Sequence, residues 1–268
     1  DILLVIDDSG SMGDEQAALA TNFAAFISSA ANSTSDWHIG VTTTDVFGLR
    51  GELARTQTNP SVLTASTPAV EALFAQKVQV GTSGSGSERA FAAMALAVTE
   101  PNKSGPNAGF LRPDAALAVV IVTDAIEQSP SNVGSYLTTM RAAKGNQSEL
   151  FSLSVVGPFS PPSSSCTTEG QVDMGRYLSA IEATHGVRAD ICTSNWALDL
   201  ESISRNVFGA RRSFTLVATP RSAVELTVMV DGAASPASAW TLSGDAVVFN
   251  TAPPAGSAIV ISYRTACF

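Results

Sequence analysis

Apolar runs and helical patterns alternate along residues 1–212. The runs at residues 2–6 (ILLVI) and 115–125 (AALAVVIVTDA) are almost continuously apolar, which is typical of central parallel strands that are covered on both faces. After the first run, apolar positions recur at helical spacing, at Leu19, Phe23, Phe26, Ile27 and Ala30. This alternation predicts an α/β fold with a doubly wound, mostly parallel sheet flanked by helices.

The same patterns predict the other elements of this domain. Further strands are expected at residues 37–44, 150–157 and 188–192, with one or two edge strands within the turn-rich segment 45–66. Further helices are expected at residues 67–78, 88–98, 133–143, 175–186 and 198–209. Thr67 as N-cap and Pro68 at the first helical position predict where the second helix begins.

The pattern changes after Arg212. Short strand-like segments follow one another, separated by Gly, Pro and Asp and with no helical pattern between them, at residues 213–218, 223–232, 237–242, 246–250 and 257–263. We therefore expect two domains, an α/β domain at 1–212 and a small all-β module at 213–268. Because the module is too small to be very stable alone, we expect it to pack on or directly follow the larger domain.

Charge and composition exclude several classes of partner. The net charge of −9 argues against nucleic acid and against an anionic membrane surface. No run approaches the roughly 18 apolar residues of a membrane helix, so direct membrane insertion is not expected. The chain opens at Asp1, directly before a strand, which suggests a processed or trimmed product with further domains in the same polypeptide.

Three cysteines bear on the compartment. Loops rich in Ser, Thr and Pro with few lysines favour an extracellular, cell-surface or periplasmic setting, in which Cys166 and Cys192 would form a disulfide. The alternative is three buried thiols in a cytosolic protein. Cys267 has no assigned partner.

Polar side chains follow the predicted strands at their carboxyl ends, where doubly wound sheets bind their ligands. The first loop carries Asp7, Ser9 and Ser11, the second Thr82, and the third Asp124. All are hard oxygen donors, which suit Mg²⁺, Ca²⁺ or Mn²⁺. The sequence therefore predicts a divalent metal site, with Mg²⁺ as the first choice.

Three short motifs carry a family resemblance. Residues 7–12 (DDSGSM) fit the Asp-x-Ser-x-Ser signature of the von Willebrand factor type A (vWA) domain. Residues 81–82 (GT) and 122–125 (VTDA) resemble that family's second and third metal-binding loops, in the same order. The resemblance covers residues 1–209 and extends to secreted or surface bacterial members of the family through stretches such as GSGSERAF.

The resemblance implies a metal-ion-dependent adhesion site, abbreviated MIDAS. Ser9, Ser11 and Thr82 would then hold the metal directly, and Asp7 and Asp124 directly or through water. An acidic group of a protein or glycan ligand would fill the open coordination position. One departure is Ala125 after Asp124, where the family often has glycine.

The second loop is enlarged and offers alternatives. Besides Thr82, it contains Ser83, Ser85 and Glu88 as further oxygen donors. Thr82 is chosen because it follows Gly81 as in the family, and Glu88 is most simply interpreted as an acid in the first turn of a helix. Asp8 is expected to be an exposed group or one that supports the ligands.

Catalytic motifs are missing from the sequence. There is no Gly-x-Ser-x-Gly elbow and no P-loop, and Ser9 stands where a phosphatase-type site needs an acid. We therefore predict a metal-dependent binding or adhesion domain and not an enzyme. Two alternatives stay open, namely a structural or assembly module that uses the metal site for subunit or intramolecular contacts and, less favoured, a metal-assisted hydrolase.

Overall fold

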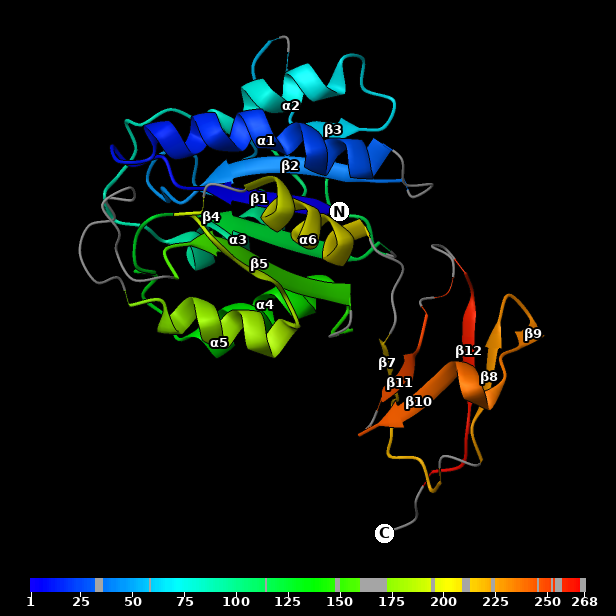
Figure 1. Cartoon of the computed structure of the whole chain (residues 1–268). Helices are drawn as coiled ribbons and strands as arrows, with labels where there is room; N and C mark the ends of the chain where they lie inside the picture. The colour runs from blue at the N-terminus through cyan, green and yellow to red at the C-terminus, as the bar shows by residue number, and fades with distance from the viewer. Residues whose placement is uncertain are drawn as a thin grey trace. The chain divides into compact units, whose positions relative to one another are not determined.

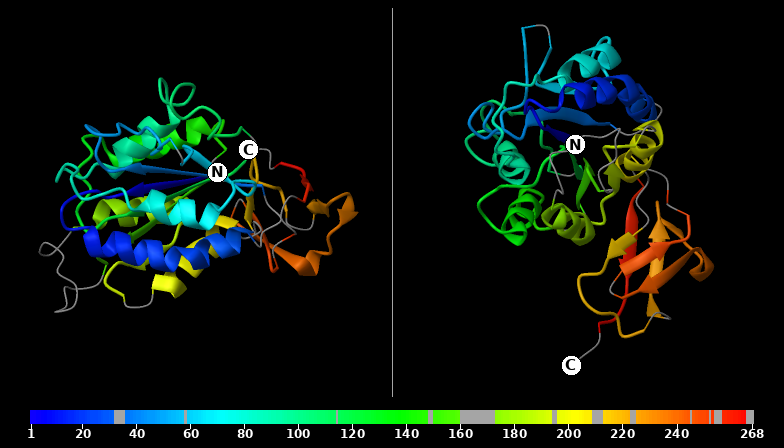
Figure 2. Two further views of the ribbon diagram at one scale, coloured as in Figure 1. Left: turned by 90° about the horizontal axis from the view of Figure 1, so that it is seen from above. Right: turned by 60° about the vertical axis from the view of Figure 1, so that its left-hand side comes forward.

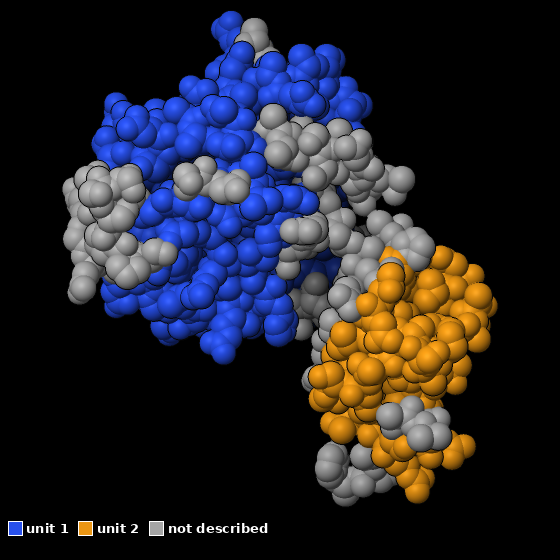
Figure 3. Space-filling view, viewed as in Figure 1, with its two compact units in different colours: residues 1–207 blue, residues 208–268 orange. Residues whose placement is uncertain are grey.

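The computed structural model describes the chain except for residues 32–35, 58, 114, 148–149, 160–172, 194–195, 209–212, 223–224, 245, 252, 254–256 and 266–268. The chain forms two compact units, Asp1–Val207 (unit 1) and Phe208–Phe268 (unit 2), which are coloured separately in Figure 3. The domain boundary expected at residue 212 falls next to this division, within residues 209–212, which are not described.

Unit 1 contains a six-stranded sheet in the order β3-β2-β1-β4-β5-β6 (Figure 1). The strands are β1 (Ile2–Ile6), β2 (His38–Thr43), β3 (Val62–Thr64), β4 (Leu117–Val122), β5 (Phe151–Gly157) and β6 (Arg188–Asp190). All neighbours pair in parallel except β2 and β3, which are antiparallel. Ile6 of β1 pairs with Thr43 of β2 and Val122 of β4, so these three strands end at one level.

Helices cover both faces of this sheet. They are α1 (Gly13–Ala31), α2 (Val70–Val78), α3 (Ala90–Val98), α4 (Val133–Ala143), α5 (Gly175–Thr184) and α6 (Trp196–Phe208). Buried residues of α3, α4 and α5 form one core cluster with Leu3, Val5, Val119 and Val155 of the strands. Helices α1 and α6 lie on the opposite face (Figure 2). The predicted doubly wound α/β fold is therefore confirmed.

Two predicted helix starts are wrong. Helix α2 begins at Val70 after Ala69, and Thr67 instead accepts a hydrogen bond from Thr64 N at 2.9 Å, because its hydroxyl closes the turn after β3. Helix α3 begins at Ala90, so Glu88 precedes the helix. Glu88, predicted as an acid in the first turn of this helix, therefore lies in the preceding loop.

The described part of unit 2 after α6 consists mainly of short β-strands, with a 3-10 helix at Ala237–Ala239. Two three-stranded antiparallel sheets have the orders β10-β11-β7 and β12-β8-β9. Their strands are β7 (Ser213–Thr215), β8 (Thr227–Val230), β9 (Ala233–Ala234), β10 (Trp240–Ser243), β11 (Ala246–Phe249) and β12 (Ile259–Ser262). A separate small core, with Val228, Trp240, Val247 and Phe249 among its members, supports this unit.

The strand predicted at 223–232 is shorter than expected. Strand β8 ends at Val230, and the chain turns at Asp231 and Gly232, whose φ angles are 50° and 79°. Positive φ at both central residues is the hairpin turn that an Asp-Gly pair favours, and it leads into β9. Within the described residues, none of the helices has the length and apolarity needed to cross a membrane.

Candidate metal-ion site

Strand β1 places Asp7 at the carboxyl end of the sheet, where its side chain is fully buried. The backbone continues the sheet, because Asp7 N donates to Val122 O at 2.9 Å. One carboxylate oxygen accepts from Ser9 N at 2.9 Å and the other from Thr123 Oγ1 at 2.6 Å. The position of Asp7 is thus fixed by its own turn and by the loop after β4.

The two serines of the first motif lie together. Ser9 Oγ and Ser11 Oγ are 3.2 Å apart, with Ser9 buried and Ser11 exposed. Buried Met12 follows, its N donating to Ser9 O at 3.2 Å, and α1 begins at Gly13. The structure therefore brings Asp7, Ser9 and Ser11 into one turn, as the motif predicts.

Gln16 joins the first loop to the second. Its amide Nε2 donates to Asp7 O at 2.9 Å and to Gly81 O at 2.7 Å, while its Oε1 accepts from Gly81 N at 3.1 Å. The side chain is almost fully buried. The two loops are therefore held at a fixed spacing by one residue of α1, which the sequence analysis did not single out.

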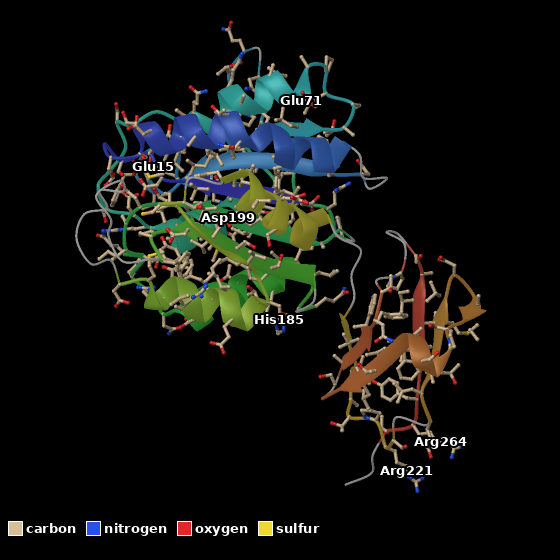
Figure 4. All side chains as sticks on the ribbon, viewed as in Figure 1. Glu15, Glu71, His185, Asp199, Arg221 and Arg264 are labelled. Carbon is tan, nitrogen blue, oxygen red and sulfur yellow. The ribbon has the colours of Figure 1, made fainter. Side chains whose placement is uncertain are left out.

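Asp124 follows β4 and is 5% exposed. Its neighbour Thr123 donates to Asp7 and accepts from Ala125 N at 3.1 Å. Burial, followed by the negative charges of Asp124, Asp14 and Asp7, raises the pKa of Glu15 in the first turn of α1. Glu15 lies at the end of α1 that faces the strand ends (Figure 4). The negative charges of Asp7 and Asp124 thus both act on Glu15.

Thr82 occupies a different position from the other predicted ligands. Its side chain is exposed and lies beside the start of α1, 3.8 Å from where a Cβ at Gly13 would be. It borders the first loop but is not buried with Asp7.

Glu88, which the sequence pattern places in the first turn of a helix, precedes α3 and is buried at the strand ends. Its side chain is 1% exposed and accepts a hydrogen bond from Thr44 Oγ1 at the end of β2. Burial, followed by the negative charge of Asp7, raises the pKa of Glu88 to about 8. The enlarged loop therefore delivers a carboxylate to the strand ends, and the only sequence signal for it is an acid placed between GSGS and the helix.

Asp8 lies against the second loop. Gly84 N donates to Asp8 O at 2.7 Å, and a Cβ at Gly84 would lie 2.3 Å from the Asp8 carboxylate, so a larger residue there would have to displace the Asp8 side chain. Burial, opposed by Thr43 and reinforced by the charge of Asp45, raises the pKa of Asp8 to about 6. Asp8 is therefore half-buried against the second loop, and its role as a group that supports the ligands stays a prediction.

The electrostatics of these loops favour a cation. Asp8, Glu15 and Glu88 each keep a buried carboxylate oxygen with no hydrogen-bond partner among the described residues. Such groups are costly unless a positive charge or a donor compensates them. The described residues contain no preformed cage of three or more acid, His or Cys side chains. The predicted donor set needs only two carboxylates, and it takes its other ligands from hydroxyls.

A pocket of about 320 Å³ opens beside Asp8. Its lining includes buried Thr43 and Lys77, together with residues of the segment 49–59, namely Leu49, Ala54, Arg55, Thr56 and Asn59. Burial lowers the pKa of Lys77 to about 8, and its Nζ donates to Ala54 O at 2.5 Å. Polar and cationic groups thus lie next to the acidic loops.

Comparisons with known proteins agree with this fold. Residues 1–206 match the family model of the von Willebrand factor type A domain. Proximal thread matrix protein 1 (PTMP1) from the mussel byssus has a TM-score of 0.50 at 13% identity, over 82% of this chain and 49% of that chain. The pilus adhesin SpaC from Lactobacillus rhamnosus GG has a TM-score of 0.48 at 11% identity, over 98% of this chain and 38% of that chain.

The similarity to solved structures is limited in both coverage and sequence identity. The chain spans about half the length of PTMP1. At 13% identity the likeness to PTMP1 shows the fold alone, and no argument rests on the likeness to SpaC. A search of curated proteins finds no match.

Proposed function

Because this chain belongs to the von Willebrand factor type A domain family, whose members generally mediate metal-dependent protein interactions, we propose that unit 1 is a metal-dependent binding domain. A divalent cation is held by Asp7, Ser9, Ser11 and Asp124 together with one residue of the second loop, for which the family motif gives Thr82. Mg²⁺ is the first candidate, with Ca²⁺ and Mn²⁺ as alternatives. Unit 1 acts outside the cytoplasm or at the cell surface.

The observation that carries this proposal is the bond between Thr123 Oγ1 and Asp7 at 2.6 Å. It ties the loop after β4, which carries Asp124, to the loop after β1, which carries Asp7, Ser9 and Ser11. Hydroxyl and carboxylate oxygens at this edge are the ligands that hard divalent cations prefer. When bound, the cation supplies a positive centre that attracts an acidic group of a protein or glycan ligand.

The surroundings of the site provide the rest of the binding surface. Phe47 is 61% exposed and its ring lies 5.0 Å from the Arg89 guanidinium, and Ile126, in the third loop, is 43% exposed. The pocket beside Asp8 accepts a polar group that neighbours the ligand's acid. We infer that the segment 48–66 reads the shape of the ligand, because five residues of that segment line the pocket.

The direct test is binding of the whole chain to immobilised peptides and glycans that carry carboxylates, in Mg²⁺ and in EDTA. Asp7→Asn is expected to lose all metal-dependent binding, because the change removes a charge and alters a carboxylate held by Ser9 and Thr123. The control is Glu71→Gln, which makes the same charge change at an exposed position of α2 (Figure 4) and is expected to bind normally. Equal binding by the Asp7→Asn variant contradicts the proposal.

A second function, assembly through the same metal site, predicts a different result. In that case the mass measured by light scattering changes when the metal is removed, with no ligand added. The third alternative, a metal-assisted hydrolase, predicts turnover of phosphate or ester substrates that Asp124→Ala abolishes. A constant mass and the absence of turnover favour the binding domain.

A further inference from the structure

The pocket beside Asp8 is lined by a buried lysine. Lys77, in the last turn of α2, is 5% exposed and borders this pocket of about 320 Å³. We propose that the pocket is a second binding site, which takes a small organic acid that also carries hydroxyl groups, such as a sugar acid, with its carboxylate against Lys77. The inference goes beyond the metal-dependent function, because side chains of the protein hold the anion and no metal ion is needed.

The ammonium group of Lys77 has a hydrogen bond but lacks a counter-charge. Its Nζ donates to Ala54 O, and no carboxylate of the described residues lies within ion-pair distance of it. Burial lowers the pKa of Lys77 to about 8, so the group still carries its charge at pH 7. Buried charges in proteins are as a rule paired, because burial removes their water. A carboxylate that enters the pocket supplies the missing charge.

Arg55 gives the pocket a second positive charge. It is an exposed residue of the lining, and it forms no ion pair within the part of the chain that the structure describes. Its guanidinium has the planar set of donors that fits a carboxylate. The lining thus contains two cations against one carboxylate, that of Asp8, in a chain whose net charge is −9. This local excess of positive charge favours an anionic ligand.

The wall formed by Ala54, Thr56 and Asn59 is fixed to the rest of unit 1. Ala54 N donates to Val41 O of β2 at 2.7 Å, and Asn59 Nδ2 donates to Leu73 O of α2 at 3.0 Å. Thr56 N donates to Asn59 O at 2.9 Å, which closes the turn between them. Because a strand and a helix both anchor this wall, the pocket is formed before a ligand binds, which lowers the entropic cost of binding.

The size and lining of the pocket favour a sugar acid over a bare anion. Its volume lies at the lower end of the range for small-molecule sites and leaves room for more than one carboxylate group. The exposed amides of Gln76 and Gln79 line it and are of a type that both donates to and accepts from hydroxyl groups. Leu49 and Val80 add apolar surface, which suits the carbon face of a sugar ring.

The test is an NMR titration of the whole chain in EDTA with glucuronate, with glucose as the neutral ring and with acetate as the bare acid. Glucuronate is expected to bind about tenfold or more tightly than either, because a hydrogen bond to a charged group contributes more than one between neutral groups. Equally tight binding of glucose or of acetate overturns the inference. Since EDTA removes divalent ions, the result does not depend on the proposed metal site.

An oligosaccharide that ends in glucuronate separates two sources of the same chemistry. Tighter binding of the oligosaccharide than of free glucuronate identifies the end of an acidic glycan as the ligand. Tighter binding of free glucuronate identifies a small metabolite. If neither probe binds, the inference is wrong.

Two variants assign the binding to the pocket. Lys77→Met keeps the length of the side chain without its charge and is expected to weaken glucuronate binding by about tenfold or more. Lys103→Met, the same change at an exposed position outside the pocket, should bind normally. Because Lys77→Met also loses the bond to Ala54 O, Arg55→Gln is the second variant, and it should melt like the unchanged chain and bind glucuronate several-fold more weakly. Normal binding by either pocket variant overturns the inference.

Discussion

Two buried glutamates flank the start of α3, and their surroundings differ. Glu127 accepts hydrogen bonds from Ser129 N, Ser129 Oγ and Phe91 N and forms an ion pair with Arg176 at 3.2 Å. Glu88 accepts one hydrogen bond, from Thr44, and faces the negative charge of Asp7. Burial raises the pKa of both side chains. The comparison teaches that Glu127 is paired with donors and a positive charge of the protein itself, whereas Glu88 lies beside a second acid, Asp7, and holds a proton more tightly.

The largest effect on stability is expected from removing Glu127, whose carboxylate has partners within the protein. Glu127→Ala leaves several buried donors and Arg176 without their acceptor, so it should lower the free energy of unfolding by about 3 kcal/mol. Urea unfolding with and without Mg²⁺ measures this loss, which should be similar in both conditions. Glu88→Gln in EDTA is the matched control and should show no such loss. Equal losses in the two variants would show that both glutamates are structural.

A smaller effect is expected from pH in the metal-free protein. The pKa of Glu88 is about 8 in the folded state against 4.5 for an unperturbed glutamate. Between these values the folded chain keeps a proton that the unfolded chain has released, so the free energy of unfolding falls as pH rises. From pH 6 to 7 this one group contributes a loss of up to about 1.4 kcal/mol.

Urea unfolding in EDTA at several pH values measures the slope. Glu15 and Glu127, whose pKa values are also raised, change stability in the same direction, so part of the slope remains in any single variant. Glu88→Gln should make the slope shallower between pH 5 and 8. An unchanged slope would place the proton on another group.

The smallest effect is expected at Gly84, where the second loop approaches Asp8. An added methyl group would meet the Asp8 carboxylate, so Gly84→Ala should cost about 1 kcal/mol of stability and shift the loop. Thermal unfolding and the Mn²⁺ affinity measure both consequences. Gly86→Ala is the matched control, because a Cβ there has nothing within 4 Å. Similar losses in both variants would point to loop flexibility in place of the clash.

The central strands of the sheet were predictable from the sequence because they are apolar along their whole length. Strands β1 and β4 are buried along their whole length, and an unbroken apolar run is a local property that needs no knowledge of the rest of the chain. The helix start at Thr67 could not be predicted in this way, since Thr67 is used by the turn after β3. Here the preference of threonine for capping a helix loses to a competing local hydrogen bond within the turn.

The placement of the candidate metal-binding residues, though not their binding of a metal, was predictable in part for a similar reason. Asp7, Ser9 and Ser11 belong to one turn, and Asp124 follows a strand that pairs with β1, so pattern and topology bring them together. Glu88 comes from a loop of Gly and Ser that has no periodicity. Only the contacts of that loop with Thr44 and Gln128 decide where its side chain points. The choice of Thr82 as a ligand stays a prediction, and so does the Cys166–Cys192 disulfide, since Cys166 lies outside the described residues.

Gln16 has a mechanical consequence for the whole site. A single amide clamps the backbone of Asp7 and the backbone of Gly81 to the second turn of α1. Any sliding of α1 along its axis must either drag both loops together or break three hydrogen bonds at once. The helix and the two loops therefore behave as one rigid linkage, and a pull on α1 is transmitted to the spacing between these loops and the segment after β4.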